Sequence, residues 1–423
     1  MLQQKKLHED WIAVIIAFLT IGLVVAGLRP ALPTFSWTNS QDLWGQIANS
    51  ANLLHMGTLF IWVLGSLLLA RLLAGDYKPK ALFTGLIAIV LISLLAQLIT
   101  SNKWVKDLGI EVVLFSLILG LFISNVIGLP NWIKPALQTE LYIKIGLVLL
   151  GTNIIFGDIM EAGMLGIIQS VLVVFTVWYF SFWLCKMLGL DDEFRMMISS
   201  AVSICGVSAA IATAGAIEGD NKKLSHVISL VMIVAIPMML FMPYIAIWAG
   251  MSPAVAGAWL GGTIDTSGAV VAAGTMLGKE ALKYATIVKF SQNVLLGLAA
   301  FLISIYWSYN NKKAGFEKPT WRTIWDRFPK FVLGFIAASL LFSFVLPSPV
   351  VAASKGPLKE LQTYWFALAF TCIGLETKFT DIFKIENGKP ALAFIIAQLF
   401  NIFFTLIVSY LVFDKVARGI MSS

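Results

Sequence analysis

Long apolar segments dominate the chain, and they decide which kind of protein it can form. Thirteen segments each hold about 20 mostly apolar residues, the length that a helix needs to cross a bilayer. Only 13% of the residues are charged, roughly half of the share in soluble domains. This excludes a soluble enzyme, a disordered protein and a secreted disulfide scaffold, and predicts an all-α polytopic membrane protein. We expect spans near residues 11–28, 53–75, 80–100, 109–128, 139–157, 163–187, 194–217, 224–248, 253–278, 284–308, 329–347, 361–378 and 390–413.

The ends of the first span and the basic loops predict the orientation. Arg29 and Pro30 follow the first apolar run where a signal peptide would have a small-residue cleavage site, so this run is interpreted as a span. The loop 309–328 is rich in Lys and Arg, which concentrate on the cytoplasmic side. We therefore expect a multi-pass protein of the bacterial inner membrane with a cytoplasmic N-terminus. The net charge of +7 then reflects these loops, and no nucleic-acid partner is expected.

Two similar stretches lie 223 residues apart. Gly151–Ile159 can be aligned with Gly374–Ile382, each at the end of an apolar span. By the span count the two spans cross the membrane in opposite directions, which is typical of the inverted repeats of secondary transporters. The identical positions are Gly151 and Gly374, Phe156 and Phe379, Asp158 and Asp381, and Ile159 and Ile382.

Two apolar segments, 199–215 and 261–274, are interrupted by small and polar residues. Irregular backbone at membrane depth is tolerated where protein or a water-filled cavity satisfies its amides. The free N–H groups of half-helix N-termini suit an anion, although small residues also allow simple close packing of helices. As the seventh and ninth spans the two segments would run parallel, whereas symmetry-related crossing helices run antiparallel. Either the span count is off between them or they are not repeat mates.

Ionisable residues inside spans are functional candidates. Asp265 lies in the second interrupted segment and Lys289 in the next span. The two side chains either pair with each other, or Lys289 holds a substrate anion while Asp265 takes a coupling proton or Na⁺. Alternatively, Lys289 extends toward water from near a helix end. Asn153 and Glu376 occupy equivalent repeat positions and are further candidates for the coupling-ion site.

The predicted substrate-binding residues come from the interrupted segments and the span after them. They are Ser203, Cys205, Gly206, Ser208, Gly262, Thr263, Thr266, Ser267, Lys289, Gln292 and Asn293. Three separated cysteines and three histidines predict neither a disulfide framework nor a metal site, so no metal and no cofactor is expected.

From about residue 80 to the C-terminus the chain resembles the sulfate exporter family of YeiH-like bacterial inner-membrane proteins. The resemblance rests on Cys205-Gly206 followed by Ser208-Ala209, on Val270–Gly274, on Val288-Lys289 and on Gly374–Glu376. It implies a fold related to the sodium/proton antiporters and bile-acid symporters, with crossed discontinuous helices in a core and a separate panel domain. It also implies transport of a small inorganic or sulfonated anion, and a homodimer.

The chain departs from that family's pattern at two places. Ile264-Asp265-Thr266 stands where the family has Ile-His-Glu, and Gln292 stands where it has Arg. A site that loses a His and an Arg and gains an Asp is less cationic. The departure favours coupling to a cation or proton.

The sequence thus predicts about 11–13 transmembrane helices with inverted repeats and two discontinuous crossing helices. We expect 1–108 to hold panel spans, 109–308 the first repeat and both interrupted helices, and 329–413 the second repeat. The leading hypothesis is an ion-coupled secondary transporter of a small anion, sulfate or sulfonate-like, that works by alternating access as a symporter or antiporter. The alternative is a monovalent cation/proton antiporter that uses Asp265. No recognisable catalytic motif supports an intramembrane enzyme.

Overall fold

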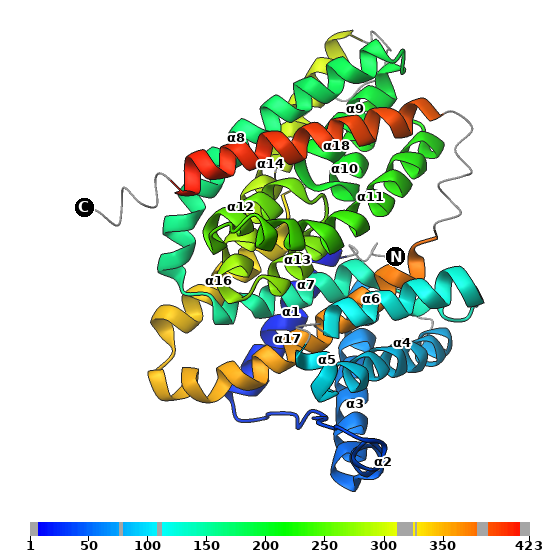
Figure 1. The fold of residues 1–423 in the computed structure, drawn as a ribbon, viewed down its shortest axis with the longest axis vertical. Coiled ribbons are helices and arrows are strands. Elements are labelled where there is room, and N and C mark those ends of the chain that lie inside the picture. Colours follow the sequence, from blue (N-terminus) through cyan, green and yellow to red (C-terminus); the bar gives the residue numbers. More distant parts are fainter. Residues whose placement is uncertain are drawn as a thin grey trace, which may run out of the picture. The chain divides into compact units, whose positions relative to one another are not determined.

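The computed structural model describes residues 7–75, 79–107, 112–310, 325, 328–378 and 388–414. These residues form helices and no β-sheet, which confirms the all-α class (Figure 1). They divide into two compact units: unit 1 comprises Met1–Phe156 and Lys330–Lys378, and unit 2 comprises Gly157–Pro329 and Phe379–Ser423. The units therefore interleave along the chain, whereas the predicted domain ranges follow chain order.

Six described helices are both long and apolar enough to cross a membrane, in keeping with a polytopic membrane protein. The prediction of 11–13 spans counted every apolar segment. The structure divides those segments among long helices, shorter apolar helices and two hairpins. The six long helices are Ser50–Ala74, Leu82–Thr100, Phe156–Met187, Asn221–Trp248, Lys279–Trp307 and Gly388–Asp414.

Unit 1 is an assembly of helices from both ends of its sequence. α7 packs against α1, α16 and α17, and α6 packs against α4 and α17. Lys144 on α7 fixes α1, because its Nζ lies 2.8 Å from Glu9 Oε1 and 3.0 Å from Asp10 Oδ1. The elements of unit 1 are α1 (Glu9–Val25), α2 (Ser40–Ala48), α3 (Ser50–Ala74), α4 (Pro79–Thr100), α5 (Lys103–Asp107), α6 (Val112–Phe122) with the π-turn η1 (Ile123–Ile127), η2 (Lys134–Ala136), α7 (Thr139–Leu150) with η3 (Gly151–Asn153), α16 (Lys330–Leu340) with the π-turn η5 (Leu341–Val345), and α17 (Ser348–Glu376).

Contacts between α7 and α17 repeat with the spacing found in the sequence. Asn153 Nδ2 donates to Gln362 Oε1 at 3.3 Å, and Thr139 Oγ1 donates to Glu376 Oε2 at 2.8 Å. Glu376 lies 223 residues after Asn153, and Gln362 lies 223 residues after Thr139. The start of α7 therefore bonds to the end of α17, and the turn after α7 bonds to the middle of α17, so the two repeat mates run antiparallel.

The repeated glycines are also used equivalently. Gly151 touches the backbone of Phe335 on α16, and Gly374 touches the backbone of Leu117 on α6. Each glycine therefore lets the end of its helix approach the apolar helix that precedes the repeat mate: α16 precedes α17, and α6 precedes α7. The acidic positions cannot be compared in this way, because Asp381 lies outside the described residues.

Unit 2 holds both interrupted segments, packed among long helices. Its apolar core takes side chains from α8, α9, α10, α11, α12, α14 and α18. The elements of unit 2 are α8 (Phe156–Met187), α9 (Asp192–Ser200), the π-turn η4 (Ala201–Cys205), α10 (Val207–Ile217), α11 (Asn221–Trp248), α12 (Pro253–Thr263), α13 (Ser267–Met276), α14 (Lys279–Asn310), α18 (Gly388–Ser409) and the π-turn η7 (Tyr410–Asp414).

The first interrupted segment is a helical hairpin. Its two ends meet, because Lys223 Nζ lies 3.0 Å from Asp191 Oδ1 and the Asp220 N–H donates to Glu193 Oε2 at 3.2 Å. A continuous helix over 192–217 would hold these ends about 39 Å apart. The chain instead turns back at Gly206, where φ is +60° and ψ is −114°. We call residues 192–217 hairpin 1.

The second interrupted segment also turns back. The Cβ position of Gly257 on α12 lies 2.9 Å from Tyr284 Cβ, and that of Gly274 on α13 lies 3.0 Å from Leu282 Cα. Both arms therefore lie against the same turn of α14, although 17 residues of straight helix would separate them by about 25 Å. We call residues 253–276 hairpin 2. Figure 1 shows α12 and α13 close together in this arrangement.

The hairpins explain why the two interrupted segments are antiparallel, although the span count makes them parallel. Only α11, a helix of 28 residues that is about 42 Å long, joins hairpin 1 to hairpin 2. Because each hairpin returns to the side from which it entered, the single crossing by α11 places the two on opposite sides. They are consequently antiparallel. The predicted breaks are at the correct residues, but each is the tip of a re-entrant hairpin instead of the middle of a crossing helix.

Cysteine labelling tests this topology. Single substitutions Asp192→Cys and Asn221→Cys at the two ends of hairpin 1 are expected to react with an impermeant maleimide from one face of oriented vesicles. Ser252→Cys and Lys279→Cys at the ends of hairpin 2 are expected to react only from the other face. The unsubstituted chain is the control, because Cys185, Cys205 and Cys372 are all buried. Labelling of Asp192→Cys and Asn221→Cys from opposite faces would contradict the hairpin.

Two glycines on α17 provide a matched test of the repeat contact. A Cβ at Gly374 would overlap the backbone of Leu117 and Gly120, whereas a Cβ at Gly356 would meet nothing within 4 Å. Gly374→Ala is therefore expected to destabilise the protein by about 1–3 kcal/mol through overpacking. Gly356→Ala is expected to be neutral or slightly stabilising. Thermal unfolding of the detergent-solubilised protein measures the difference, and equal melting temperatures would refute the close contact.

Candidate functional site

The tips of the two hairpins meet inside unit 2. A Cβ at Gly206 would lie 3.0 Å from Asp265 Cβ and 2.7 Å from Val231 Cγ1. Only glycine fits this close approach, and its positive φ is also strained for any other residue. The backbone break of hairpin 1 therefore lies directly against the break of hairpin 2.

Amide side chains satisfy the carbonyl groups that the breaks release. Gln292 Nε2 on α14 donates to Gly262 O at 2.9 Å and to Ser203 O at 3.4 Å. Asn401 Nδ2 on α18 donates to Val202 O at 3.1 Å and to Thr263 O at 3.3 Å. Each of these amides bridges both hairpins. Because lipid offers no donors, these bonds are what makes irregular backbone tolerable here.

Lys289 completes the same set of donors. Its Nζ lies 2.8 Å from Ile204 O at the end of η4 and 3.1 Å from Gln292 Oε1, and the residue is 2% exposed. The ammonium thus stabilises the negative end of a half-helix. It also interacts electrostatically with Asp265. Lys289 therefore does not extend toward water, and one of its three N–H donors is left for another partner.

The outer side of the tips carries half-helix N-termini. α10 begins after Gly206 without a side-chain cap, so its first N–H groups are not occupied by one. Thr266 caps α13, since its Oγ1 accepts from the Ala269 N–H at 3.3 Å. Ser208 is exposed, and Thr266 and Ser267 are half-buried, whereas Asp265 is buried. The first turns of α10 and α13 are therefore less buried than Asp265.

Comparison with known proteins agrees with this membrane fold. Residues 84–394 match the family model described as conserved hypothetical protein 698. The chain belongs to this family. The match confirms the predicted YeiH-like membership. No solved structure matches the chain.

Several relatives carry the name UPF0324 membrane protein. One from Rhodopirellula baltica is 40% identical over 338 residues, which cover 78% of this chain and 62% of the relative. One from Nitratidesulfovibrio vulgaris is 39% identical over 353 residues, covering 80% of this chain and 60% of the relative. One from Pseudomonas putida is 29% identical over 328 residues, which cover 76% of this chain and 90% of the relative. The chain thus spans about three fifths of the length of the first two relatives.

Most of the predicted site residues of this family member come together in unit 2. All eleven predicted substrate-binding residues and Asp265 lie at the hairpin tips or on the adjoining turns of α14. Their role in binding stays a prediction. Asn153 and Glu376 belong to unit 1, where they lie at opposite ends of the α7–α17 pair and bond to Gln362 and Thr139.

Sequence reasoning missed three amide side chains of the centre. Gln398 and Asn401 on α18 donate to the carbonyl groups of the tips, and Gln169 Nε2 on α8 donates to Ala258 O at 2.8 Å. All three are buried. They are uncharged, and an amide inside an apolar span is a weaker signal of function than an ionisable residue. Amides three residues apart in a 22-residue apolar helix were the available signal.

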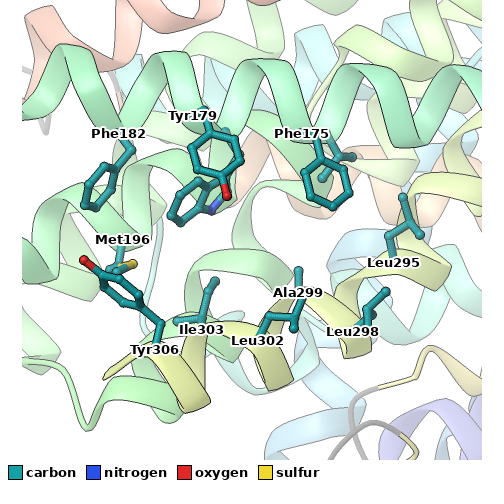
Figure 2. A pocket seen from close by; sticks show the side chains of 12 residues that line it. Phe175, Tyr179, Phe182, Met196, Leu295, Leu298, Ala299, Leu302, Ile303 and Tyr306 are labelled. Carbon is teal, nitrogen blue, oxygen red and sulfur yellow. The ribbon is translucent and has the colours of Figure 1, made fainter. Parts of the chain in front are cut away.

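A separate groove of about 280 Å³ lies between α8 and α14. Figure 2 shows the rings of Phe175, Tyr179 and Phe182 on α8 facing Leu298 and Tyr306 on α14. Its lining is almost entirely apolar and holds no charged side chain. It offers nothing to hold an inorganic ion, so the hairpin tips are the candidate site.

The charge pair of the site can be tested by stability. Lys289→Met is expected to destabilise the protein strongly, because it leaves the buried Asp265 carboxylate without its compensating charge; such losses cost about 3–5 kcal/mol. Adding Asp265→Asn is expected to recover part of that loss, with a coupling of roughly 0.5–3 kcal/mol. Melting temperatures of both single variants and the double variant measure the coupling. Strictly additive effects would show that the two charges do not interact.

Proposed function

We propose that the chain is an ion-coupled secondary transporter of a small anion, sulfate or sulfonate-like, that works by alternating access. The observation that carries the proposal is the contact between two opposed re-entrant hairpins whose tips enclose buried charged groups. Discontinuous helices that present their termini to one another near the bilayer midplane are typical of substrate sites in secondary transporters.

The arrangement of dipoles at the tips suits an anion. The N-terminus of α10 carries no side-chain cap, and its first turn is partly exposed; half-helix N–H groups there favour negative charge. The hydroxyl group of Ser208 lies in the same first turn. The remaining N–H donor of Lys289 adds a fixed positive charge behind them. Together these groups offer hydrogen-bond donors to an oxyanion.

The charge balance of the centre favours coupling. With Asp265 ionised and Lys289 protonated the buried centre is neutral, so a bound anion adds an uncompensated negative charge. Burying such a charge in a low-dielectric interior is costly unless a cation accompanies it. Co-binding of a proton or Na⁺ with the anion would remove that cost. A carrier built this way moves the two ions together.

A monovalent cation/proton antiporter on the same scaffold is the second candidate. The observation that favours it is the buried Asp265 carboxylate, whose two oxygens make no hydrogen bond of good geometry with the described residues and have only the Gln398 amide nearby. Exchange of cations for protons that persists without any transported anion would favour this alternative.

Transport by proteoliposomes tests the proposal. Uptake of radiolabelled sulfate is expected to follow either the pH gradient or the Na⁺ gradient when the two are imposed separately. Lys289→Gln is expected to lower uptake on the order of 100-fold, because a hydrogen bond from a charged donor to the anion is lost.

Lys283→Gln is the matched control. Lys283 lies on the same helix, but its Nζ pairs with Asp158 Oδ2 at 3.4 Å, away from the tips. It is expected to keep most of the uptake. Full activity of Lys289→Gln would refute the role of Lys289 in anion binding. Sealed vesicles that transport neither sulfate nor a small alkylsulfonate would refute the anion carrier and leave the cation/proton exchanger.

A further inference from the structure

Four buried side chains around the tip of hairpin 2 each leave an oxygen atom without a hydrogen-bond donor. These atoms are Thr263 Oγ1, Gln398 Oε1, Asn293 Oδ1 and the two carboxylate oxygens of Asp265, which have only the Gln398 amide nearby as a donor and no hydrogen bond of good geometry. The four residues are between 1% and 4% exposed. An unpaired buried oxygen normally costs about 1–3 kcal/mol, so four such residues from three elements around one hairpin tip call for a partner.

Hydrogen bonds of the same side chains hold these oxygens around the tip. Gln398 Nε2 donates to Thr263 O at 3.0 Å, which places its amide beside the end of α12. Asn293 Nδ2 donates to Ser267 Oγ at 3.0 Å, which places its amide beside the start of α13. Asp265 lies between these two anchor points in the sequence. In both amides the nitrogen donates a hydrogen bond to the protein, whereas the oxygen accepts none.

The unpaired atoms of these four residues are all oxygens. Each of them can bind a hard cation as a ligand, and only the Thr263 hydroxyl could also donate to an anion. The single carboxylate supplies one negative charge, and the ammonium of Lys289 nearby opposes a higher positive charge. Among the described residues no group of three or more His, Cys, Asp or Glu is present that would hold a transition metal. The set therefore suits a monovalent cation of the size of Na⁺.

We propose that the tip of hairpin 2 is a Na⁺ site in which Asp265, Thr263 and Gln398 supply the ligands and Asn293 supplies a fourth oxygen. Its identity as the coupling-ion site rests on the proposed transport function, but binding of the cation does not. Lys289 donates to Ile204 O at the carbonyl end of hairpin 1, while Na⁺ binds the oxygens around the tip of hairpin 2. The substrate anion is then attracted to a centre that carries one net positive charge.

Binding of radiolabelled Na⁺ to the purified full-length protein in detergent tests the site, with choline as the replacement cation and no transportable anion present. We expect one saturable site per chain and a rise in melting temperature with Na⁺ at constant ionic strength. Asp265→Asn is expected to abolish saturable binding. Thr263→Val and Gln398→Leu are each expected to weaken it on the order of tenfold.

Thr275→Val is the matched control, because Thr275 lies on hairpin 2 and its Oγ1 is already bonded to Val271 O at 2.7 Å. It is expected to bind Na⁺ like the unsubstituted chain. Saturable binding that survives Asp265→Asn, or the absence of saturable binding by the folded protein, would overturn the site. Equal binding by Thr263→Val and Thr275→Val would remove Thr263 from the ligand set.

The outcomes separate this inference from the proposed function. Na⁺ binding without anion uptake under any gradient would keep the cation site and refute the anion carrier. Anion uptake that is driven by pH alone, in a protein that binds no Na⁺, would refute the cation site and keep the carrier.

Discussion

The structure of unit 2 depends on one constraint, which is that backbone carbonyl groups released inside a membrane protein must find donors within the protein. Two hairpin tips release such groups in one place, at Val202, Ser203, Ile204, Gly262 and Thr263. Gln292, Asn401, Gln398 and Lys289 satisfy them. Because two of these amides bond to both hairpins at once, the same contacts that make each tip tolerable also hold the tips together.

The centre therefore has two distinct regions, one of side-chain donors and one of helix N-termini. Side-chain donors gather at the carbonyl ends of the half-helices. The N-terminal turns of α10 and α13 are less buried, and Asp265 directly precedes the N-cap of α13. A cation at the oxygens and an anion at the N-termini would each lower the cost of burying the other, and this mutual effect is reciprocal by thermodynamic necessity. Coupling then requires no long pathway, because both ions share one small electrostatic environment.

Much of this fold could be predicted from the sequence, and the part that could not has a physical reason. Hydropathy identified the class, and the small and polar residues of 199–215 and 261–274 identified the breaks. It did not distinguish a crossing helix from a hairpin, since a segment of about 25 apolar residues has the length for either. The contacts that decide between them, such as Lys223 with Asp191, join residues outside the apolar runs.

In the repeat and in the site, too, some residues could be recognised from the sequence and others could not. Gly151 and Gly374 could be matched from sequence because the close helix approach demands glycine, whereas Thr139 and Gln362 share a position but not a residue type. At the site, Asp265 and Lys289 were recognisable because charge inside a span is rare. Gln398 and Asn401 were not, since the reason for their presence is a set of carbonyl groups 135 to 199 residues away in the chain.

That separation has a consequence for biosynthesis. α18 is the last described helix of the chain, and it donates to the tips of both hairpins, which are made well before it. While the ribosome is still making the helices of unit 1 that intervene, α16 and α17, Val202 and Thr263 have no access to Asn401. Until α18 is made, these two carbonyl groups lack the donor that they have in the folded protein. Closure of the centre is a late event that depends on the C-terminal helix.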